Sequence, residues 1–429
     1  MSNKQRNEGI ETKCIHSGYT PQNGEPRVVP IVQSTTYSFD STEQIAGLFD
    51  MPTEFMYSRF ANPTCDAVEK KIAELEGGAA AMLTSSGQAA SLLSILNICN
   101  AGDSFIAASA IYGGTINLFA VTLKRFGIEC IWVDQDASEE EIQKAFKDNT
   151  KAVFGETLAN PALTVLDIEK FASIAHKNGV PLIVDNTFAT PILCRPFEHG
   201  ADIVVHSTTK YLDGHAVQVG GVIVDGGTFD WTASGKFPEF TEPDESYHGV
   251  IYTREFGNIA YIIKCRMQLM RDFGCYPSAH SAFLLNLGIE TLAVRMKQYC
   301  YNALEVAKFL EKSDKVISVN YPGLETDKHH SLAKKYLPDG ASGVITFVIK
   351  GGRETAVKFM DSLELASRVV HVADIRTCAL HPASATHRQL TDEQLVAAGI
   401  NAGMIRLSVG LENVEDIIYD VEQALSKIE

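Results

Sequence analysis

The sequence lacks several features that would place it in a familiar class of protein. None of its apolar runs approaches the roughly 20 residues that a helix needs to cross a bilayer. The polar stretch from Met1 to Gly9 lacks the apolar core of a secretory signal. The nine cysteines form no Cys-x-x-Cys pair and no regular framework, which favours reduced thiols over disulfides. These absences lead us to expect a cytoplasmic protein.

Basic residues and well-known catalytic signatures are also scarce. The 37 Lys and Arg against 53 Asp and Glu give a formal net charge of -16, which disfavours nonspecific binding to nucleic acid or to an anionic membrane. The chain has no Gly-x-Ser-x-Gly elbow, no P-loop and no His-Glu-x-x-His pattern. Cys14 with His16, and His381 with His387, have metal-like spacings but no further clustered ligands. We therefore expect no nucleic acid, membrane or metal ion as a partner.

What the sequence does contain is enough apolar material for a large core. With 429 residues and 45% hydrophobic composition, the chain is long enough for two or three domains. Residues 1–62 carry turn signals without sustained helical periodicity, which predicts an extended N-terminal arm. We expect a large domain over residues 63–265 and a smaller C-terminal domain over residues 266–429.

Beyond the arm, short apolar runs alternate with helical stretches. A helix is expected to begin at Asn62-Pro63-Thr64 and to end at Gly77-Gly78. The alternation that follows is typical of an α/β fold with a mostly parallel sheet covered by helices. The predicted strands are Ala80–Thr84, Phe105–Ala108, Ile128–Val133, Ala152–Gly155, Leu182–Val184, Ile203–Val205 and Val222–Val224. The smaller α/β domain is predicted from a long helical region at 281–311 and strands at 316–320, 344–349 and 405–409.

Lys210 and Asp185 give the strongest chemical signal. Lys210 follows a buried strand and a Ser207-Thr208-Thr209 segment whose hydroxyls can bind phosphate. This arrangement suits a Schiff base with an aldehyde cofactor whose phosphate must also be held. Asp185 ends another strand, where it can pair with a protonated ring nitrogen and keep the ring able to accept electrons. Either residue alone would be read as a surface Lys or a loop Asp, but together they predict a pyridoxal-phosphate site.

Two further segments can contribute to a phosphate site. In Thr84–Gln88 a strand runs into a helix, so exposed amides near Gly87 and Gln88 can bind phosphate at the positive helix end. Tyr57 and Arg59 lie in the arm, from which they can complete the phosphate site, including that of a neighbouring subunit. The alternative for these two residues is an exposed Arg beside a packing Tyr.

Tyr112 and Arg406 are candidates for contact with a substrate. Tyr112 precedes Gly113-Gly114, where it can stack on a flat cofactor and exchange protons at the leaving group, or else is a core Tyr. Arg406 alternates with apolar residues in a predicted strand, so its side chain points inward and needs an anionic partner. That partner is either a substrate carboxylate held bidentately by the guanidinium or an internal Asp or Glu.

These motifs occur together as a set: Tyr57-Ser58-Arg59-x-x-Asn62-Pro63-Thr64, Ser85-Ser86-Gly87, Tyr112-Gly113-Gly114-Thr115, Val184-Asp185-Asn186-Thr187 and Ser207-Thr208-Thr209-Lys210. As a set they resemble the Cys/Met-metabolism pyridoxal-phosphate enzymes, over nearly the whole chain. The resemblance implies a fold-type I transferase with a large, mostly parallel seven-stranded sheet domain, a smaller α/β C-terminal domain and an extended N-terminal arm. It also implies a homotetramer of two close dimers, in which arm residues complete the partner's site.

The resemblance also implies a role for each matching residue. Lys210 carries the cofactor, pyridoxal 5'-phosphate, as a Schiff base, and Asp185 meets its pyridine nitrogen. Tyr112 stacks on the ring, and Arg406 binds the substrate carboxylate. Asn160 matches a position near both the cofactor hydroxyl and that carboxylate. The phosphate is held by Ser207, Thr209, Gly87 and Gln88, with Tyr57 and Arg59 supplied across the dimer.

Within that family, the segments Phe240–Gly249 and His381–Leu390 look most like O-acetylhomoserine sulfhydrylases. Methionine γ-lyases typically have a Cys where this chain has Gly114. One segment departs from the sulfhydrylase pattern, which usually reads Asn-Val-Gly-Asp where this chain has His371-Val372-Ala373-Asp374. Because this loop lies near the substrate in relatives, His371 is a candidate substrate-binding residue.

The implied reaction is a γ-replacement in methionine biosynthesis, carried out by a transferase. Lys210 removes the α proton of O-acetyl-L-homoserine, a second proton leaves the β carbon, and acetate departs from the γ carbon with help from Tyr112. Sulfide or a thiol then adds, which gives homocysteine or methionine. Methionine γ-lyase and cystathionine γ-synthase or γ-lyase would use the same cofactor residues and stay open as alternatives. A pyridoxal-phosphate-binding protein without turnover is the alternative from another class.

Overall fold

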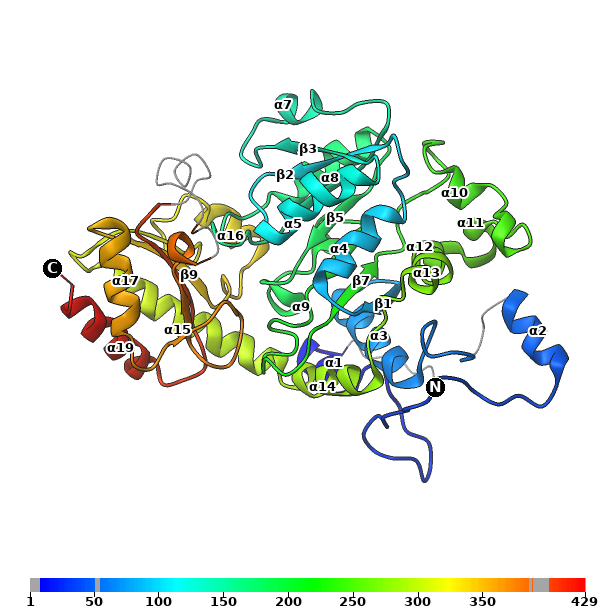
Figure 1. Cartoon of the computed structure of the whole chain (residues 1–429), viewed down its shortest axis with the longest axis horizontal. Coiled ribbons are helices and arrows are strands. Elements are labelled where there is room, and N and C mark those ends of the chain that lie inside the picture. Colours follow the sequence, from blue (N-terminus) through cyan, green and yellow to red (C-terminus); the bar gives the residue numbers. More distant parts are fainter. Residues whose placement is uncertain (1–7, 51–54, 386–387, 389–400, 429) are drawn as a thin grey trace, which may run out of the picture.

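The computed structural model describes residues 8–50, 55–385, 388 and 401–428. Two sheets lie beside each other, and α15 (Leu292–Glu311) contacts elements of both parts (Figure 1). The predicted α/β fold with a larger and a smaller sheet is confirmed. The domain boundary after residue 265 stays a prediction. No helix in the described ranges is both long enough and apolar enough to span a membrane.

The larger sheet has seven strands in the order β1-β7-β6-β5-β4-β2-β3. β7 runs antiparallel to its neighbours β1 and β6, and every other neighbouring pair is parallel, as predicted. The strands are β1 Ala80–Thr84, β2 Ser104–Ala108, β3 Glu129–Val133, β4 Thr150–Glu156, β5 Leu182–Asp185, β6 Ile203–His206 and β7 Gly221–Asp225.

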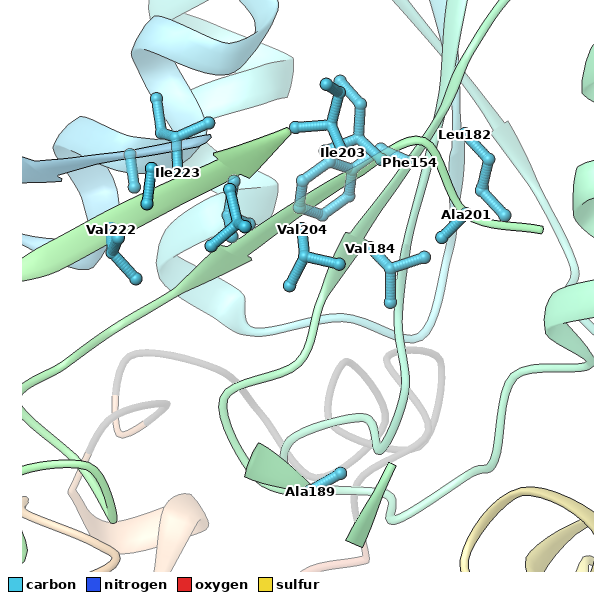
Figure 2. Packing of buried hydrophobic residues seen from close by; sticks show 14 of the residues in the cluster. Phe154, Leu182, Val184, Ala189, Ala201, Ile203, Val204, Val222 and Ile223 are labelled. Carbon is cyan, nitrogen blue, oxygen red and sulfur yellow. The ribbon is translucent and has the colours of Figure 1, made fainter. Parts of the chain in front are cut away.

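The central strands of this sheet are apolar over most of their length because helices cover the sheet. Figure 2 shows Val184 of β5, Val204 of β6 and Val222 of β7 packed in one buried cluster. Around them α3 (Pro63–Glu76), α4 (Gly87–Leu96), α8 (Ile168–Lys177) and α12 (Ala260–Cys265) contact the strands. A rigid apolar sheet therefore fixes where the polar residues at the strand ends lie.

The predicted start and stop of α3 are confirmed. The Asn62 side chain accepts a hydrogen bond from the Thr64 N–H at 3.0 Å, and Pro63 occupies the first turn. Gly77 ends the helix with φ 79, a left-handed conformation that glycine adopts without steric cost.

The arm contains two helices that the sequence did not predict, α1 (Ile10–His16) and α2 (Thr42–Asp50). Neither is long enough to establish a clear apolar period, and helices this short are marginal in isolation. α1 packs against α3, α14 and α15 and buries Cys14, whereas α2 extends away from the body of the molecule (Figure 1). The predicted extended arm therefore also carries two short helical segments.

The smaller sheet has five strands in the order β10-β11-β12-β9-β8. The expected helical region at 281–311 is two helices, α14 (Ala279–Glu290) and α15, separated at Thr291. The strands are β8 Val316–Asn320, β9 Val344–Ile349, β10 Ser367–Arg368, β11 Cys378–Leu380 and β12 Met404–Ser408. The remaining longer helices are α16 His330–Tyr336, α17 Gly352–Ser362 and α19 Val414–Ser426.

Short helices connect the main elements of both parts. They include α5 Gly113–Asn117, α6 Leu123–Arg125, α7 Glu139–Gln143, α9 Thr190–Leu193, α10 Pro238–Thr241, α11 Tyr252–Phe256 and α13 Arg271–Phe273.

Candidate active site

A cavity of about 600 Å³ lies at the carboxyl ends of β4, β5 and β6, the edge at which open parallel sheets bind ligands. Part of its wall comes from the smaller sheet, through Leu380 of β11 and Arg406 of β12. Most residues that the sequence singled out line this cavity: Gly87, Gln88, Tyr112, Asn160, Asp185, Ser207, Thr209, Lys210 and Arg406.

Lys210 lies in the turn that follows β6. Its backbone N–H donates to the Ser207 carbonyl at 3.2 Å, and its carbonyl accepts from the Gly214 N–H at 2.7 Å. Burial, and secondarily the cation of Arg406, lower the pKa of Lys210 to about 8. A useful fraction of the amine is therefore unprotonated near neutral pH, as both a nucleophile and a base require.

Two carboxyl groups stand side by side at the ends of neighbouring strands, where Glu156 pairs with Asp185 in the sheet register. Asp185 Oδ1 accepts hydrogen bonds from the N–H of Thr187, at 3.0 Å, and from its hydroxyl. Burial raises the pKa of Asp185, and burial together with the Asp185 charge raises the pKa of Glu156 well above its ordinary value. A cation brought to Asp185 would stabilise its ionised form.

Glu156 is the residue of this site whose role the sequence did not reveal. Its Oε1 accepts from the Tyr112 N–H at 2.7 Å, and its Oε2 accepts from the Asn160 N–H at 3.2 Å. One buried carboxyl group therefore joins the segment that carries Tyr112 to the segment that carries Asn160. The available signal was an acidic residue at the end of an apolar strand, the same signal that drew attention to Asp185.

The N-terminus of α4 and the segment after β6 form one end of the cavity. The first N–H groups of a helix have no partner within the helix, so those of Gly87 and Gln88 suit an anion. A Cβ on Gly87 would lie 2.6 Å from Ser207 Cβ, so glycine is what allows this close approach. Thr209 Oγ1 accepts from the Gly220 N–H at 3.0 Å, which fixes the hydroxyl beside them.

Tyr112 directly precedes α5 and is 47% exposed, so it is not the core Tyr that the sequence left as an alternative. A Cβ on Gly114 would lie 2.4 Å from Tyr112 Cε1. The Tyr112 ring can therefore lie against the start of α5 only because position 114 has no side chain. Gln88 Nε2 donates to Thr115 Oγ1 at 3.2 Å and ties α4 to the same helix.

Arg406 is buried, with 6% of its surface exposed. Its Nη1 donates to Asn160 Oδ1 at 3.2 Å, and its Nη2 donates to the carbonyls of Val370 at 3.0 Å and His371 at 3.3 Å. None of these partners is charged, and no Asp or Glu of the described residues forms an ion pair with it. Of the two partners that the sequence left open, an anionic ligand is the one that this geometry favours.

His371 does not line the cavity but lies beside Lys210, with 3.4 Å between its Nδ1 and the Lys210 Nζ. Ala373 has φ 66, in the left-handed region that favours glycine, the residue that the sulfhydrylase pattern has here. The Ala373 N–H donates to Ser408 Oγ at 2.8 Å. Ala373 therefore has the backbone conformation that glycine would adopt, and in this loop His371 places an imidazole next to the lysine.

Tyr57 and Arg59 do not line the cavity of their own chain. The Arg59 guanidinium carbon lies 5.0 Å from the centre of the Tyr57 ring, and Tyr57 is 38% exposed. Arg59 Nε is buried and has no hydrogen-bond partner within the described residues. Their predicted role across a dimer stays a prediction.

In the His381–Leu390 segment, residues 386–387 and 389–390 lie outside the described residues.

A model of the family described as Cys/Met metabolism PLP-dependent enzyme matches residues 11–426. The chain belongs to this family. An O-acetyl-L-homoserine sulfhydrylase of Leptospira meyeri is 48% identical over 435 residues, which cover 99% of this chain and 98% of that protein. A homocysteine synthase of Schizosaccharomyces pombe is 46% identical over 422 residues, 97% of this chain and 98% of that protein. The resemblance inferred from the motifs is confirmed.

A crystal structure of a similar protein supports the fold and the cofactor. It is of an O-acetylhomoserine (thiol)-lyase of Campylobacter jejuni with N'-pyridoxyl-lysine-5'-monophosphate. The two chains have a TM-score of 0.94 and 38% identity, covering 98% of this chain and 100% of that one. The fold-type I prediction is therefore confirmed, and this PLP-dependent enzyme takes pyridoxal 5'-phosphate as its cofactor.

The cavity of this PLP-dependent enzyme has the groups that such a cofactor needs. An amine of lowered pKa, Lys210, lies in the same cavity as Asp185, a buried carboxyl group whose ionised form a cation would stabilise. The N-terminus of α4 beside Ser207 offers a place for a phosphate. Among the described residues no group of three or more His, Cys, Asp or Glu is placed to hold a metal ion.

Proposed function

We propose that this enzyme catalyses γ-replacement on O-acetyl-L-homoserine with sulfide or a thiol, which gives homocysteine or methionine and releases acetate. The names of the full-length relatives support the substrate and the product. The observation that carries the proposal is one cavity that holds the Lys210 amine and a buried Arg406 with no ion-pair partner among the described carboxylates. An α-amino acid offers both a carboxylate for Arg406 and an acidic Cα–H for Lys210.

Substrate binding is assigned to Arg406 and Asn160. The planar guanidinium can bind the substrate carboxylate through two parallel hydrogen bonds, which fixes the orientation of the amino acid as well as its position. Asn160 Oδ1 accepts from Arg406 and so holds the guanidinium in place. The Glu156 carboxylate binds the Asn160 backbone and keeps this segment at the cavity.

Proton transfers are assigned to Lys210 and Tyr112. Pyridoxal phosphate, when bound, supplies an electron sink for the charge that develops on the substrate. The free Lys210 amine removes the α proton and returns it later, and its lowered pKa suits both directions near neutral pH. Tyr112 lies at the same cavity, where its hydroxyl can assist departure of acetate. Glu156 positions Tyr112 through the backbone hydrogen bond at 2.7 Å.

The residues that would hold the cofactor follow from the same cavity. Lys210 would anchor it covalently, and Asp185 would carry the negative charge opposite the ring nitrogen. The N–H groups of Gly87 and Gln88, with the hydroxyls of Ser207 and Thr209, would bind the phosphate.

We also propose that the enzyme is a homotetramer, a dimer of dimers, with active sites shared between subunits. The support comes from Tyr57 and Arg59, which match the family motif but stay away from the cavity of their own chain. Within the described residues Arg59 Nε has no hydrogen-bond partner, so the guanidinium is not committed to an acceptor in its own chain.

The proposed function is tested by presenting one purified preparation, loaded with pyridoxal phosphate, with a panel of substrates. We expect homocysteine from O-acetylhomoserine and sulfide, and methionine when methanethiol replaces sulfide. Methionine alone and cystathionine alone should be consumed far more slowly. Rapid consumption of methionine with release of 2-oxobutyrate would instead identify a γ-lyase, and inactivity toward every amino acid would leave only cofactor binding.

A further inference from the structure

The loop between β10 and β11 places an imidazole against the lysine that carries the chemistry. His371 Nδ1 is 3.4 Å from Lys210 Nζ, at the long end of the hydrogen-bond range, as is common before a substrate is bound. The contact joins residues 161 positions apart in the sequence. Within the described residues, the His371 side chain makes this hydrogen bond through Nδ1. Its other ring nitrogen, Nε2, is buried there without a hydrogen-bond partner.

The charges around His371 favour a neutral imidazole. An ammonium group on Lys210 can only donate, so Nδ1 accepts from it and the imidazole proton resides on Nε2. The facing titratable and charged groups come from the segment after β6, from β11, from β12 and from the loop itself: Lys210, Cys378, Arg406, Asp374 and Arg376. Asp374 is paired with Arg376 at 3.2 Å, which leaves positive charge in excess. Burial and the nearby Lys210 cation lower the pKa of His371.

The loop does not depend on the imidazole for its own shape. The His371 carbonyl accepts from Arg406 Nη2 at 3.3 Å and from Cys378 Sγ at 3.4 Å, so both bonds use the backbone of His371 and not its side chain. The Ala373 N–H is held by Ser408 Oγ at 2.8 Å. A replacement of the His371 side chain therefore keeps these contacts and removes the one to Lys210.

We propose that His371 is a positioning residue for Lys210, whose neutral imidazole accepts a hydrogen bond from the free amine and holds it at the substrate. Protonation of the imidazole removes this acceptor, and the Nδ1–H then donates to the lone pair of the free amine, the electron pair that must take the substrate proton. The inference rests on the proposed role of Lys210 as the base. Its consequence is that two groups must be unprotonated on the acid side, the amine and the imidazole.

The variants His371→Asn and His371→Ala separate the hydrogen bond from its titration. Asparagine offers an acceptor close to the place of Nδ1 but does not titrate, whereas alanine offers none. kcat/KM is measured against pH for all three enzymes with O-acetylhomoserine and sulfide. Dividing the wild-type kcat/KM by that of H371N removes the pH dependence that comes from ionisation of the substrate and the cofactor, because both enzymes share it. We expect this ratio to be constant at alkaline pH and to fall by up to about tenfold per pH unit below the imidazole pKa.

H371A should be slower than H371N by roughly 2- to 10-fold at alkaline pH, the effect of one lost hydrogen bond. A second readout needs no amino acid. It is the rate at which added pyridoxal phosphate is captured by the cofactor-free full-length chain, followed by absorbance. The capture rate of the wild type divided by that of H371N should show the same pH dependence as the kcat/KM ratio. The reason is that capture also requires an unprotonated, correctly placed Lys210.

A ratio independent of pH in the capture experiment overturns the role of His371, whatever the enzyme's substrate. Equal rates for H371A and H371N at alkaline pH do the same, because the hydrogen bond would then have no effect. If capture shows the expected ratio while O-acetylhomoserine is not turned over, the proposed function fails and the placement of Lys210 by His371 stands.

Discussion

Lys210 shows how one residue gains reactivity from its surroundings. Lysine in water has a pKa near 10.4 and is almost fully protonated at neutral pH. Burial and the Arg406 cation both destabilise the charged form of Lys210 and bring its pKa to about 8. The sequence predicted the residue from the strand and the hydroxyls that precede it. It did not show the Arg406 cation, which comes from β12 of the other sheet.

Replacement of this lysine is the most direct test of its role. Lys210→Ala should abolish the visible absorbance of the covalently held cofactor and lower turnover by at least roughly 10²- to 10⁴-fold, because the base is lost. Absorbance spectra and a homocysteine assay measure the two effects. Lys210→Arg is the matched control, since it keeps the cation but cannot act as base near neutral pH. Retention of both properties in K210A would contradict the assignment.

Arg406 is a residue for which the sequence left two possible anionic partners open. The alternating pattern showed an inward Arg in a strand, but a strand pattern does not show which charges face it across the molecule. The structure shows Asn160 and two carbonyls around the guanidinium. Glu156 was missed for a similar reason, because its role comes from backbone groups of Tyr112 and Asn160 rather than from a motif.

Arg406→Lys should weaken binding of the amino-acid substrate. Lysine keeps the charge but loses the paired donors, a loss of about 1.5–3 kcal/mol that corresponds to a rise in KM of roughly 10- to 150-fold. Steady-state kinetics with varied O-acetylhomoserine measures this rise, and the cofactor absorbance should not change. An unaltered KM would mean that the carboxylate binds elsewhere.

At the scale of elements, the sheet was predictable and the two short helices of the arm were not. The seven strands are short, mainly apolar runs between turn residues, and α3 has Asn62, Pro63 and Gly77 at the positions that begin and end a helix. In contrast, α1 is stabilised by packing against α3, α14 and α15, contacts that no local pattern contains. The break between α14 and α15 was not predictable either, because the residue at the break is Thr291 and not a Gly or Pro.

The approach of α4 to the segment after β6 predicts an effect of a single methyl group. In Gly87→Ala the new Cβ would lie 2.6 Å from Ser207 Cβ and 2.8 Å from its Cα, so one of the two segments must move. Overpacking of this kind costs about 1–3 kcal/mol, and here it displaces groups proposed to hold the phosphate. We expect a raised dissociation constant for pyridoxal phosphate, measured by fluorescence titration of the cofactor-free protein.

Gly113→Ala is the control for that experiment, because a Cβ at Gly113 has no heavy atom within 4 Å. Both variants carry the same added methyl near the cavity, and only G87A should lose affinity. Equal affinities for the two variants would show that α4 does not contact the phosphate.

At the scale of the whole molecule, the proposed sharing of sites makes a prediction about mixed subunits. Arg59→Ala and Lys210→Ala are each expected to be nearly inactive. A hybrid dimer contains one site that has Lys210 from one subunit and Arg59 from the other. Random mixing after dissociation should therefore restore up to about a quarter of the wild-type activity. If each chain completes its own site, mixing restores none.

The chemistry of the whole molecule is tested most directly by the balance of its products. Acetate, homocysteine and 2-oxobutyrate are measured in one time course with O-acetylhomoserine and excess sulfide. γ-Replacement predicts one homocysteine for each acetate released, with almost no 2-oxobutyrate, and predicts that K210A forms neither product. Acetate matched by 2-oxobutyrate and ammonia instead of homocysteine would contradict the proposal, because it would show elimination without addition of sulfide.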